Sequence, residues 1–184
     1  MDHGTIVRAQ GGDHAAFSLL VEATVARLHR VARLILRDDE RASDAVQDAL
    51  TQAWLDIRAV RDPARFEAWI YRLLVRACYR EADRQRRRRT HEVHVESIEV
   101  AARPTGLDVV QRDYLARGFR TLSAEHRAAL VVRHYLGLTD GEAAEALGIP
   151  VGTYKSRLNR ATSALRAALE ADDRAPEAAL ETLA

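Results

Sequence analysis

The sequence predicts an all-α protein made of two small helical domains joined by a flexible linker. Only nine glycines and four prolines occur among its 184 residues, and 47% of the residues are hydrophobic. Apolar residues recur at helical spacing through most of the chain, whereas alternating β-branched runs are few. The helical periodicity fails between residues 91 and 107. We therefore expect domains at 1–90 and 108–169, a linker at 91–107 and a frayed acidic tail at 170–184.

Cysteine content and hydropathy exclude several classes of protein. Cys78 is the single cysteine, so the chain has neither an intramolecular disulfide framework nor a cysteine cluster for zinc. No apolar run approaches the ~18 residues of a membrane span, and the first residues lack the pattern of a signal peptide. We expect a soluble, cytoplasmic protein without membrane insertion. His91 and His94 have the spacing of a metal pair but no further ligands nearby, so we predict no metal and no cofactor.

The net charge of +1 conceals a segregation of charge along the chain. Residues 61–89 carry ten basic and four acidic side chains, whereas residues 170–184 carry one basic and five acidic side chains. A basic segment in the middle of the chain and an acidic tail indicate a nucleic-acid partner more strongly than the total charge does.

Two helices are predicted before residue 60. The first follows the Gly11-Gly12 break and extends to Leu36 as one long amphipathic helix. The second begins near Ser43, and its polar face is acidic and rich in amides; this face carries Asp44, Gln47 and Asp48. Considered alone, such a face would be an ordinary solvated helix surface.

The third predicted helix begins near Pro63 and mixes aromatic with basic side chains. Trp69 and Tyr71 lie about 200° apart around a helix axis, so at least one of them should lie near the surface. Aromatic rings can stack on exposed bases while arginines hold the phosphates, as binding of single-stranded nucleic acid requires. The competing interpretations are a core tryptophan and, at residues 86–89, a solvated or disordered run of arginines.

The second half of the chain predicts a helix at 108–121, a helix capped by Ser123, and a helix-turn-helix at 139–161. Thr139 and Glu142 have the spacing of a capping box, and Gly148 can take the left-handed conformation that ends a helix. A fully extended linker of 17 residues spans roughly 55 Å. Two DNA-reading units could then lie a duplex turn or more apart.

The last predicted helix starts after Pro150 and has two distinct faces. Its apolar stripe contains Val151, Tyr154, Leu158, Ala161 and Leu165, and should pack inward. Its opposite face is polar and basic, and carries Thr153, Lys155, Ser156, Asn159 and Arg160, with Arg157 at the flank. Such a face suits the major groove of DNA, although a helical hairpin with a solvated basic face would show the same pattern.

Four segments in order resemble the bacterial sigma factors of the extracytoplasmic-function (ECF) type, over essentially residues 5–169. They are GDHAAFSLLV, SDAVQDALTQAW, RFEAWIYRLLVRACYREADRQRRRR and LSAEHRAALVVRHYLGLTDGEAAEALGIPVGTYKSRLNRA. The resemblance implies a domain that melts promoters (sigma region 2) and a domain that binds the minus-35 element (sigma region 4). It further implies that the chain binds core RNA polymerase, at the β′ clamp helices and the β flap, and directs it to particular promoters.

Site residues carry over from the family by position. Asp44, Gln47 and Asp48 match the segment that binds the β′ clamp helices, with Asp48 where Glu is usual. The segment that opens the minus-10 element is matched by Trp69, Tyr71 and Arg72, followed by Arg76, where the family commonly has Asn, and Arg80, where Asp or Asn is common. In the family, residues of the recognition helix bind the bases and phosphates of the minus-35 element. The positions that match them here are Thr153, Lys155, Ser156, Arg157, Asn159 and Arg160.

Members of the family are frequently held inactive by an anti-sigma factor, so the resemblance implies a possible anti-sigma factor as a further partner. No segment resembles a catalytic set, so we predict that the chain is not an enzyme. The alternative is a stand-alone helix-turn-helix regulator, which would carry an α/β receiver or ligand domain in the N-terminal half. An RNA-binding or nuclease-like enzyme is a more remote third hypothesis, because the sequence lacks carboxylate pairs and its one histidine pair has no further metal ligands nearby.

Overall fold

The computed structural model describes residues 2–91 and 107–181, with side chains described at 2–88 and 114–172. The first half contains α1 (His3–Gln10), α2 (His14–Leu36), α3 (Asp39–Asp56) and α4 (Phe66–His91), with 3-10 turns at Ile57–Ala59 and Pro63–Arg65. The second half contains α5 (Leu107–Arg120), α6 (Ala124–Leu130), a π-helical turn (Val131–Tyr135), α7 (Asp140–Leu147) and α8 (Val151–Glu181). Throughout these described ranges the regular structure is helical, which confirms the predicted fold class.

Local sequence explains where the helices begin and turn. Asp13 and Asp38 are N-caps whose carboxylates accept hydrogen bonds from the third residue of α2 and α3, each at 3.0 Å. Between the two helices, Arg37 takes the left-handed conformation at φ 60°. A single residue thereby reverses the chain and sets α2 and α3 side by side.

One helix and two helix boundaries differ from the sequence prediction. Helix α1 was not predicted, and α3 starts at Asp39 rather than near Ser43 because Asp38 caps it. The prediction of a frayed tail from residue 170 is wrong as far as residue 181, where α8 ends. Alanine, the residue with the highest helix propensity, is frequent in this stretch and favours continuation of the helix. Residues 92–106 of the predicted linker lie outside the described residues.

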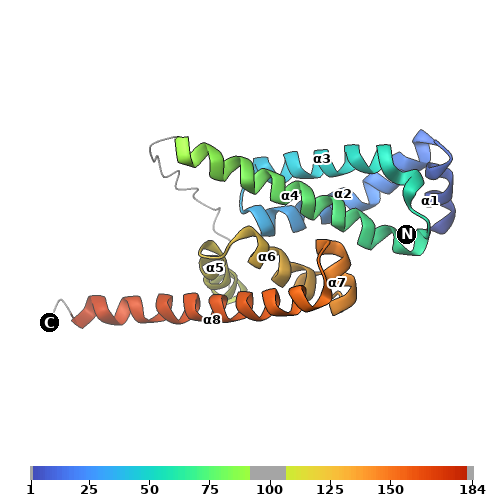
Figure 1. The fold of residues 1–184 in the computed structure, drawn as a ribbon. Coiled ribbons are helices and arrows are strands. Elements are labelled where there is room, and N and C mark those ends of the chain that lie inside the picture. The colour runs from blue at the N-terminus through green and yellow to red at the C-terminus, as the bar shows by residue number, and fades with distance from the viewer. Residues whose placement is uncertain (1, 92–106, 182–184) are drawn as a thin grey trace.

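The two halves form two packed layers, with α1–α4 in one and α5–α8 in the other (Figure 1). Helix α4 lies between them: it packs against α2 and α3 on one side and against α6 and α7 on the other. One continuous apolar core therefore joins buried residues from both halves, such as Leu74 and Val75 of α4 with Ala144 of α7 and Tyr154 of α8. A smaller cluster around Leu122, Leu130 and Ala161 holds α8 to the rest of its own layer.

Candidate nucleic-acid interface

The acidic and amide face of α3 is exposed. Asp44 and Gln47 point to solvent, and Asp48 is half-buried beside α4. The Asp48 carboxylate lies 3.6 Å from the Arg80 guanidinium, so a residue expected to bind polymerase is paired with one expected to bind DNA. Because this ion pair is largely exposed, it contributes at most about 1 kcal/mol to stability.

The two aromatic residues of α4 differ in exposure. Trp69 is half-buried, with its ring centroid 5.7 Å from that of Phe66, whereas Tyr71 is only 4% exposed. Tyr71 is buried because α4 is covered on two sides, and this burial raises the pKa of its hydroxyl. Of the pair, Trp69 is therefore the more accessible to a base.

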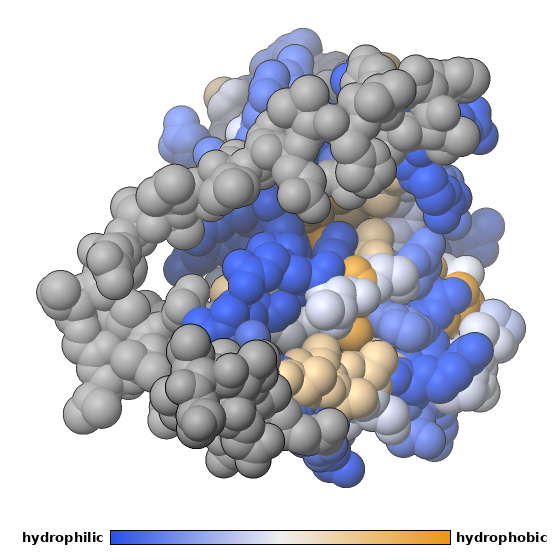
Figure 2. Space-filling view, turned by 90° about the vertical axis from the view of Figure 1, so that its left-hand side faces the viewer, coloured by the Kyte–Doolittle hydropathy of each residue, from blue (hydrophilic) through white to orange (hydrophobic). Residues whose placement is uncertain are grey.

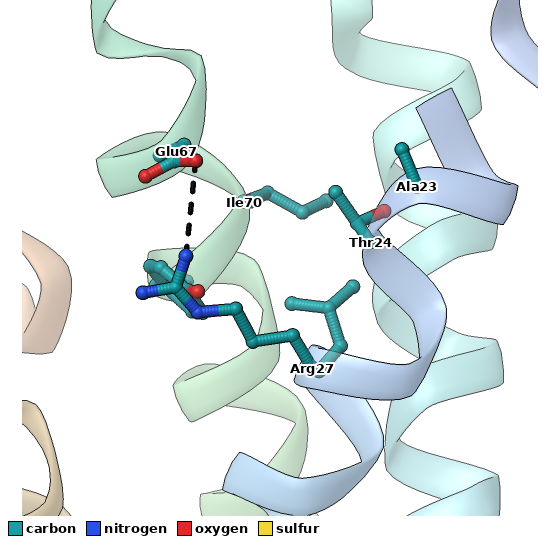
Figure 3. A pocket seen from close by; sticks show the side chains of 7 residues that line it. Ala23, Thr24, Arg27, Glu67 and Ile70 are labelled. Carbon is teal, nitrogen blue, oxygen red and sulfur yellow. Dashed lines mark ion pairs between the residues drawn. The ribbon is translucent and has the colours of Figure 1, made fainter. Parts of the chain in front are cut away.

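Tyr71 also lines a cavity of about 280 Å³ between α2 and α4, shown in Figure 3. Arg27 reaches across the cavity from α2: its guanidinium lies 3.9 Å from the Glu67 carboxylate and 5.7 Å from the centre of the Tyr71 ring. The Thr24 hydroxyl donates to the Leu20 carbonyl oxygen at 2.6 Å. Thr24, Arg27 and Glu67 thus already bond within the protein, and the lining residues hold no nucleophile beside a base.

The arginines predicted to meet the minus-10 element lie in two settings. Arg80 is exposed on the side of α4 that faces α3. Arg72 is half-buried, and its Nε has no hydrogen-bond partner among the described residues. Arg76 lies beside Gly148 of the helix-turn-helix, where a Cβ would come within 3.8 Å of the Arg76 Nη2 atom.

The predicted capping box of the helix-turn-helix is confirmed. The Thr139 backbone N–H donates to the Glu142 carboxylate at 2.8 Å, and the Glu142 N–H donates to the Thr139 hydroxyl at 3.4 Å. The hydrogen bond from the Thr139 hydroxyl, with a smaller contribution from its backbone N–H, lowers the pKa of Glu142. Gly148 ends α7 at φ 66°, as expected.

Helix α8 presents its polar face outward as the periodicity predicts, but one member of the predicted inward stripe is wrong: Val151, the first residue of the helix, is 42% exposed. Tyr154 and Ala161 are fully buried and fix the rotation of the helix about its axis. The outward side chains are all exposed, namely Thr153, Lys155, Ser156, Asn159 and Arg160. Arg157 is half-buried at the flank, and its Nη1 donates to the Tyr79 hydroxyl of α4 at 3.4 Å. Burial raises the pKa of Tyr79 to about 12, against the opposing effect of Arg157.

The side of the molecule at which α4 and α8 end is mainly hydrophilic over its coloured surface, with a small apolar area near its centre (Figure 2). Within the described residues, no three His, Cys, Asp or Glu side chains are grouped so as to hold a metal ion. Nor does that part of the chain contain a helix long and apolar enough to cross a membrane.

Models of two sigma-70 regions match the two layers of the fold. The model of sigma-70 region 2 matches residues 20–88, and the model of sigma-70 region 4 matches residues 112–165. The ECF RNA polymerase sigma factor SigM of Mycobacterium tuberculosis H37Rv is 36% identical over 155 residues, covering 84% of this chain and 77% of SigM. This chain is an ECF sigma factor of the sigma-70 family. The ECF sigma-E factor of Escherichia coli K12 is 30% identical, covering 89% of the chain and 92% of sigma-E.

Solved structures agree with this assignment. RpoE of Bartonella quintana, solved with the anti-sigma factor NepR, matches with a TM-score of 0.68 at 26% identity, over 85% of this sigma factor and 98% of RpoE. CnrH, solved with the cytosolic domain of CnrY, matches with a TM-score of 0.65 at 26% identity, over 93% of the sigma factor and 98% of CnrH.

The sigma factor directs transcription, and the alternative of a stand-alone regulator is not favoured. Region 2 occupies the half of the chain where such a regulator would carry a receiver or ligand domain. Sequence reasoning missed three residues that join region 2 to region 4, namely Arg65, Tyr79 and Arg127. Each of the three contacts a residue at least 78 positions away in the sequence, and helical periodicity carries no signal of such a contact.

Proposed function

We propose that this sigma factor binds core RNA polymerase through α3, opens and holds the minus-10 element along α4, and binds the minus-35 element with the first half of α8. The polymerase then supplies the chemistry of RNA synthesis, and the β flap holds region 4. The observation that carries the proposal is the outward face of α8, where five exposed polar side chains surround a buried Tyr154.

The face of α8 can make two kinds of contact with duplex DNA. Arginine and lysine can bind guanine edges or phosphates, and asparagine can bind adenine. Arg160 follows Ser156 by one helical turn, and its Nε donates to the Ser156 carbonyl oxygen at 3.2 Å, so the two side chains share one face. Lys155 is held 3.6 Å from Asp140 at the start of α7, an exposed pair that DNA phosphates can displace.

Region 2 supplies the complementary contacts. The carboxylate of Asp44 and the amide of Gln47 are exposed and can meet a basic surface on the β′ clamp helices. The Trp69 ring can stack on an unpaired base of the minus-10 element while Arg72 and Arg76 neutralise phosphates. An anti-sigma factor is a further proposed partner, because the similar RpoE of Bartonella quintana was solved with one.

The minus-35 assignment is tested with polymerase reconstituted from core enzyme and sigma factor, on a promoter selected by this holoenzyme from randomised DNA. Arg160→Ala should reduce transcription strongly, while Arg166→Ala, an exposed arginine further along α8, serves as the matched control. If Arg160 contacts a base, changing that base pair costs the wild type about 1–3 kcal/mol of binding and the variant much less. A phosphate contact would instead weaken all sequences equally and reduce the salt dependence. Full activity of an Arg157→Ala, Arg160→Ala double variant would contradict the assignment.

Polymerase binding is tested by the same reconstitution without DNA. Asp44→Arg should weaken the complex because it opposes like charges, and the exposed position leaves the fold intact. Glu22→Arg on α2 makes the same change of charge on another exposed surface and should bind normally. Asp48→Arg also removes the ion pair to Arg80, so Asp44 gives the cleaner comparison. Equal affinity of the Asp44 variant and the control would remove α3 from the interface.

A further inference from the structure

A second cavity, of about 460 Å³, lies between α4 and the segment that joins α5 to α6. Residues of α4 between 82 and 86 line one side of it, and residues between 120 and 127 line the other. We refer to it as the junction cavity. Its volume is within the range of roughly 300–1,000 Å³ that is usual for small-molecule sites. The residues assigned to polymerase and promoter contacts do not line it, so the proposed function gives this cavity no role.

Arg127 of α6 lines the junction cavity and is half-buried there. Its Nε donates to the carbonyl oxygen of Ile35, and its Nη1 donates to the carbonyl oxygens of Leu122 at 2.7 Å and Phe119 at 3.4 Å. All three acceptors are neutral, and Nη2 has no hydrogen-bond partner among the described residues. The guanidinium therefore keeps its charge and has donors available for a ligand.

The charge of Arg127 is not paired with a carboxylate in the described part of the chain. Burial, followed by the charge of Arg37, lowers the pKa of Arg127 to about 10, and Glu125 opposes this shift only in part. The side chain still stays protonated at neutral pH. A half-buried cation that is repelled by a neighbouring cation is stabilised by an anion that binds beside it. The surroundings of Arg127 therefore favour an anion in the junction cavity.

Two more arginines line the junction cavity. Arg120, at the end of α5, is exposed and has no hydrogen bond or ion pair among the described residues. Arg86 approaches from α4 and pairs with Asp83 at 2.6 Å. The lining thus holds three guanidiniums and two carboxylates, those of Asp83 and Glu125. Burial opposes the ionisation of Glu125, but hydrogen bonds from its own backbone N–H and from the Ser123 hydroxyl lower its pKa overall. With both carboxylates ionised, the lining still has one net positive charge.

We infer that the junction cavity binds a small molecule that carries two neighbouring phosphate groups, held chiefly by Arg127 and Arg120. Guanidinium groups match phosphate oxygens because their planar donors can form two parallel hydrogen bonds. Since Arg86 lies on the opposite side of the cavity, a ligand with two phosphates can meet guanidiniums on both sides, whereas a single phosphate cannot. Leu122 and Ala124 add an apolar part to the lining, which an organic group attached to the phosphates would cover.

The arrangement favours a small molecule over a nucleic-acid strand. The available donors line a hollow rather than a ridge, so a phosphate has to enter the cavity to reach Arg127. A terminal phosphate can do so, because it presents three acceptor oxygens and a charge of about −1.5 to −2 at neutral pH. A phosphate within a strand has a single charge, and its two ester bonds hold it on the backbone.

The first test titrates the full-length chain with inorganic pyrophosphate in a calorimeter, in chloride buffer without magnesium and at constant ionic strength. We expect one saturable site and weaker binding of orthophosphate. Arg120→Ala should weaken pyrophosphate binding about tenfold, the usual effect of losing a hydrogen bond to a charged group. Arg166→Ala removes the same charge from an exposed arginine of α8 outside the cavity and should bind as the wild type does. Equal affinities of the two variants, or no saturable binding to the wild type, would overturn the inference.

The second test asks whether the anion enters the cavity. Gln85→Trp fills part of the cavity from the α4 side without changing its charge, and should abolish pyrophosphate binding. Gln52→Trp, at an exposed glutamine of α3, is the matched control and should leave binding unchanged. Wild-type affinity in Gln85→Trp would show that the anion is held by diffuse surface charge and would contradict the inference. Displacement of pyrophosphate by a short oligothymidylate would assign the site to a nucleic-acid strand and would also contradict it.

Variants of Arg127 test the group that the inference places at the centre of the site. Arg127→Gln removes the charge and should abolish detectable binding, whereas Arg127→Lys keeps the charge without the planar fork and should bind with intermediate affinity. Circular dichroism and the Tm of each variant show whether it folds, because Arg127 also bonds to three carbonyl groups. If Arg127→Gln does not fold, Arg120→Ala and Gln85→Trp decide the question. Undiminished binding by folded Arg127→Gln would refute the site.

Discussion

Tyr154 offers a test of how the recognition helix is held. Among the described residues it is the largest side chain that is fully buried, and its hydroxyl has no hydrogen-bond partner there. An unsatisfied buried hydroxyl costs about 1–3 kcal/mol. Tyr154→Phe keeps the ring in place and removes this cost, so we expect the free energy of unfolding to rise by about 1 kcal/mol.

Thermal unfolding followed by circular dichroism measures the effect. For a protein of this size, 1 kcal/mol corresponds to a rise in Tm of about 3 °C. Tyr154→Ala, which empties the same site, should cost roughly 3–5 kcal/mol and reduce minus-35 binding because the rotation of α8 is no longer fixed. Tyr135→Phe, at a tyrosine that is 44% exposed, is the control and should change nothing.

The dependence on pH gives an independent check. Burial, followed by the charge of Asp140, raises the pKa of Tyr154. Above pH 10 the tyrosine ionises in the unfolded chain before it does so in the folded protein, so the unfolded state binds fewer protons and stability falls as pH rises. Tyr154→Phe should lose less stability in this range. A variant that is less stable than the wild type at pH 7 by 1 kcal/mol or more would show that the hydroxyl has a partner and refute the argument.

Three further outcomes are expected. Thr139→Ala removes the N-cap of α7 and should lower the free energy of unfolding by ~1 kcal/mol in urea titrations; no change would mean that the capping box is not formed in solution. Tyr79→Phe should flatten the loss of stability between pH 10 and 12, because the raised pKa of Tyr79, about 12, makes the folded state hold its proton longer than the unfolded state; the opposite slope would contradict its burial. Cys78 should resist a thiol reagent at pH 8 in the folded protein and react only on unfolding, since burial disfavours its thiolate; rapid reaction in the native state would show local opening of α4.

Local features of the sequence determined the helix-turn-helix. The Thr139–Glu142 capping box, the left-handed Gly148 and the inward Tyr154 each depend on residues within a few positions of one another, or on one helix period. The exposure of Lys155 and Arg160 follows from the same period. The all-α class and the long amphipathic α2 could be predicted for the same reason.

The surroundings of helix α4 could not be predicted from the sequence. Its pattern led us to expect one buried face, with the remaining aromatic and basic residues toward solvent or DNA. In the structure α4 is packed against α2 and α3 on one side and against the second layer on the other, so Tyr71 is buried and Arg72 is half-buried. An arginine stripe on a helix is compatible with water, with phosphate and with a partner helix, and periodicity cannot distinguish these.

Tertiary structure alone decided which distant residues meet. Arg65 pairs with Glu145, Arg127 with the carbonyl oxygen of Ile35, and Arg157 with Tyr79, although none of these pairs is close in sequence. Such contacts form only after the chain between them has been closed into a loop, and their stability comes from the packing of whole helices around them. Residue types and local spacing therefore determined the surfaces that this sigma factor carries, whereas the packing of α7 against α4 decided which of those surfaces is covered in the free chain.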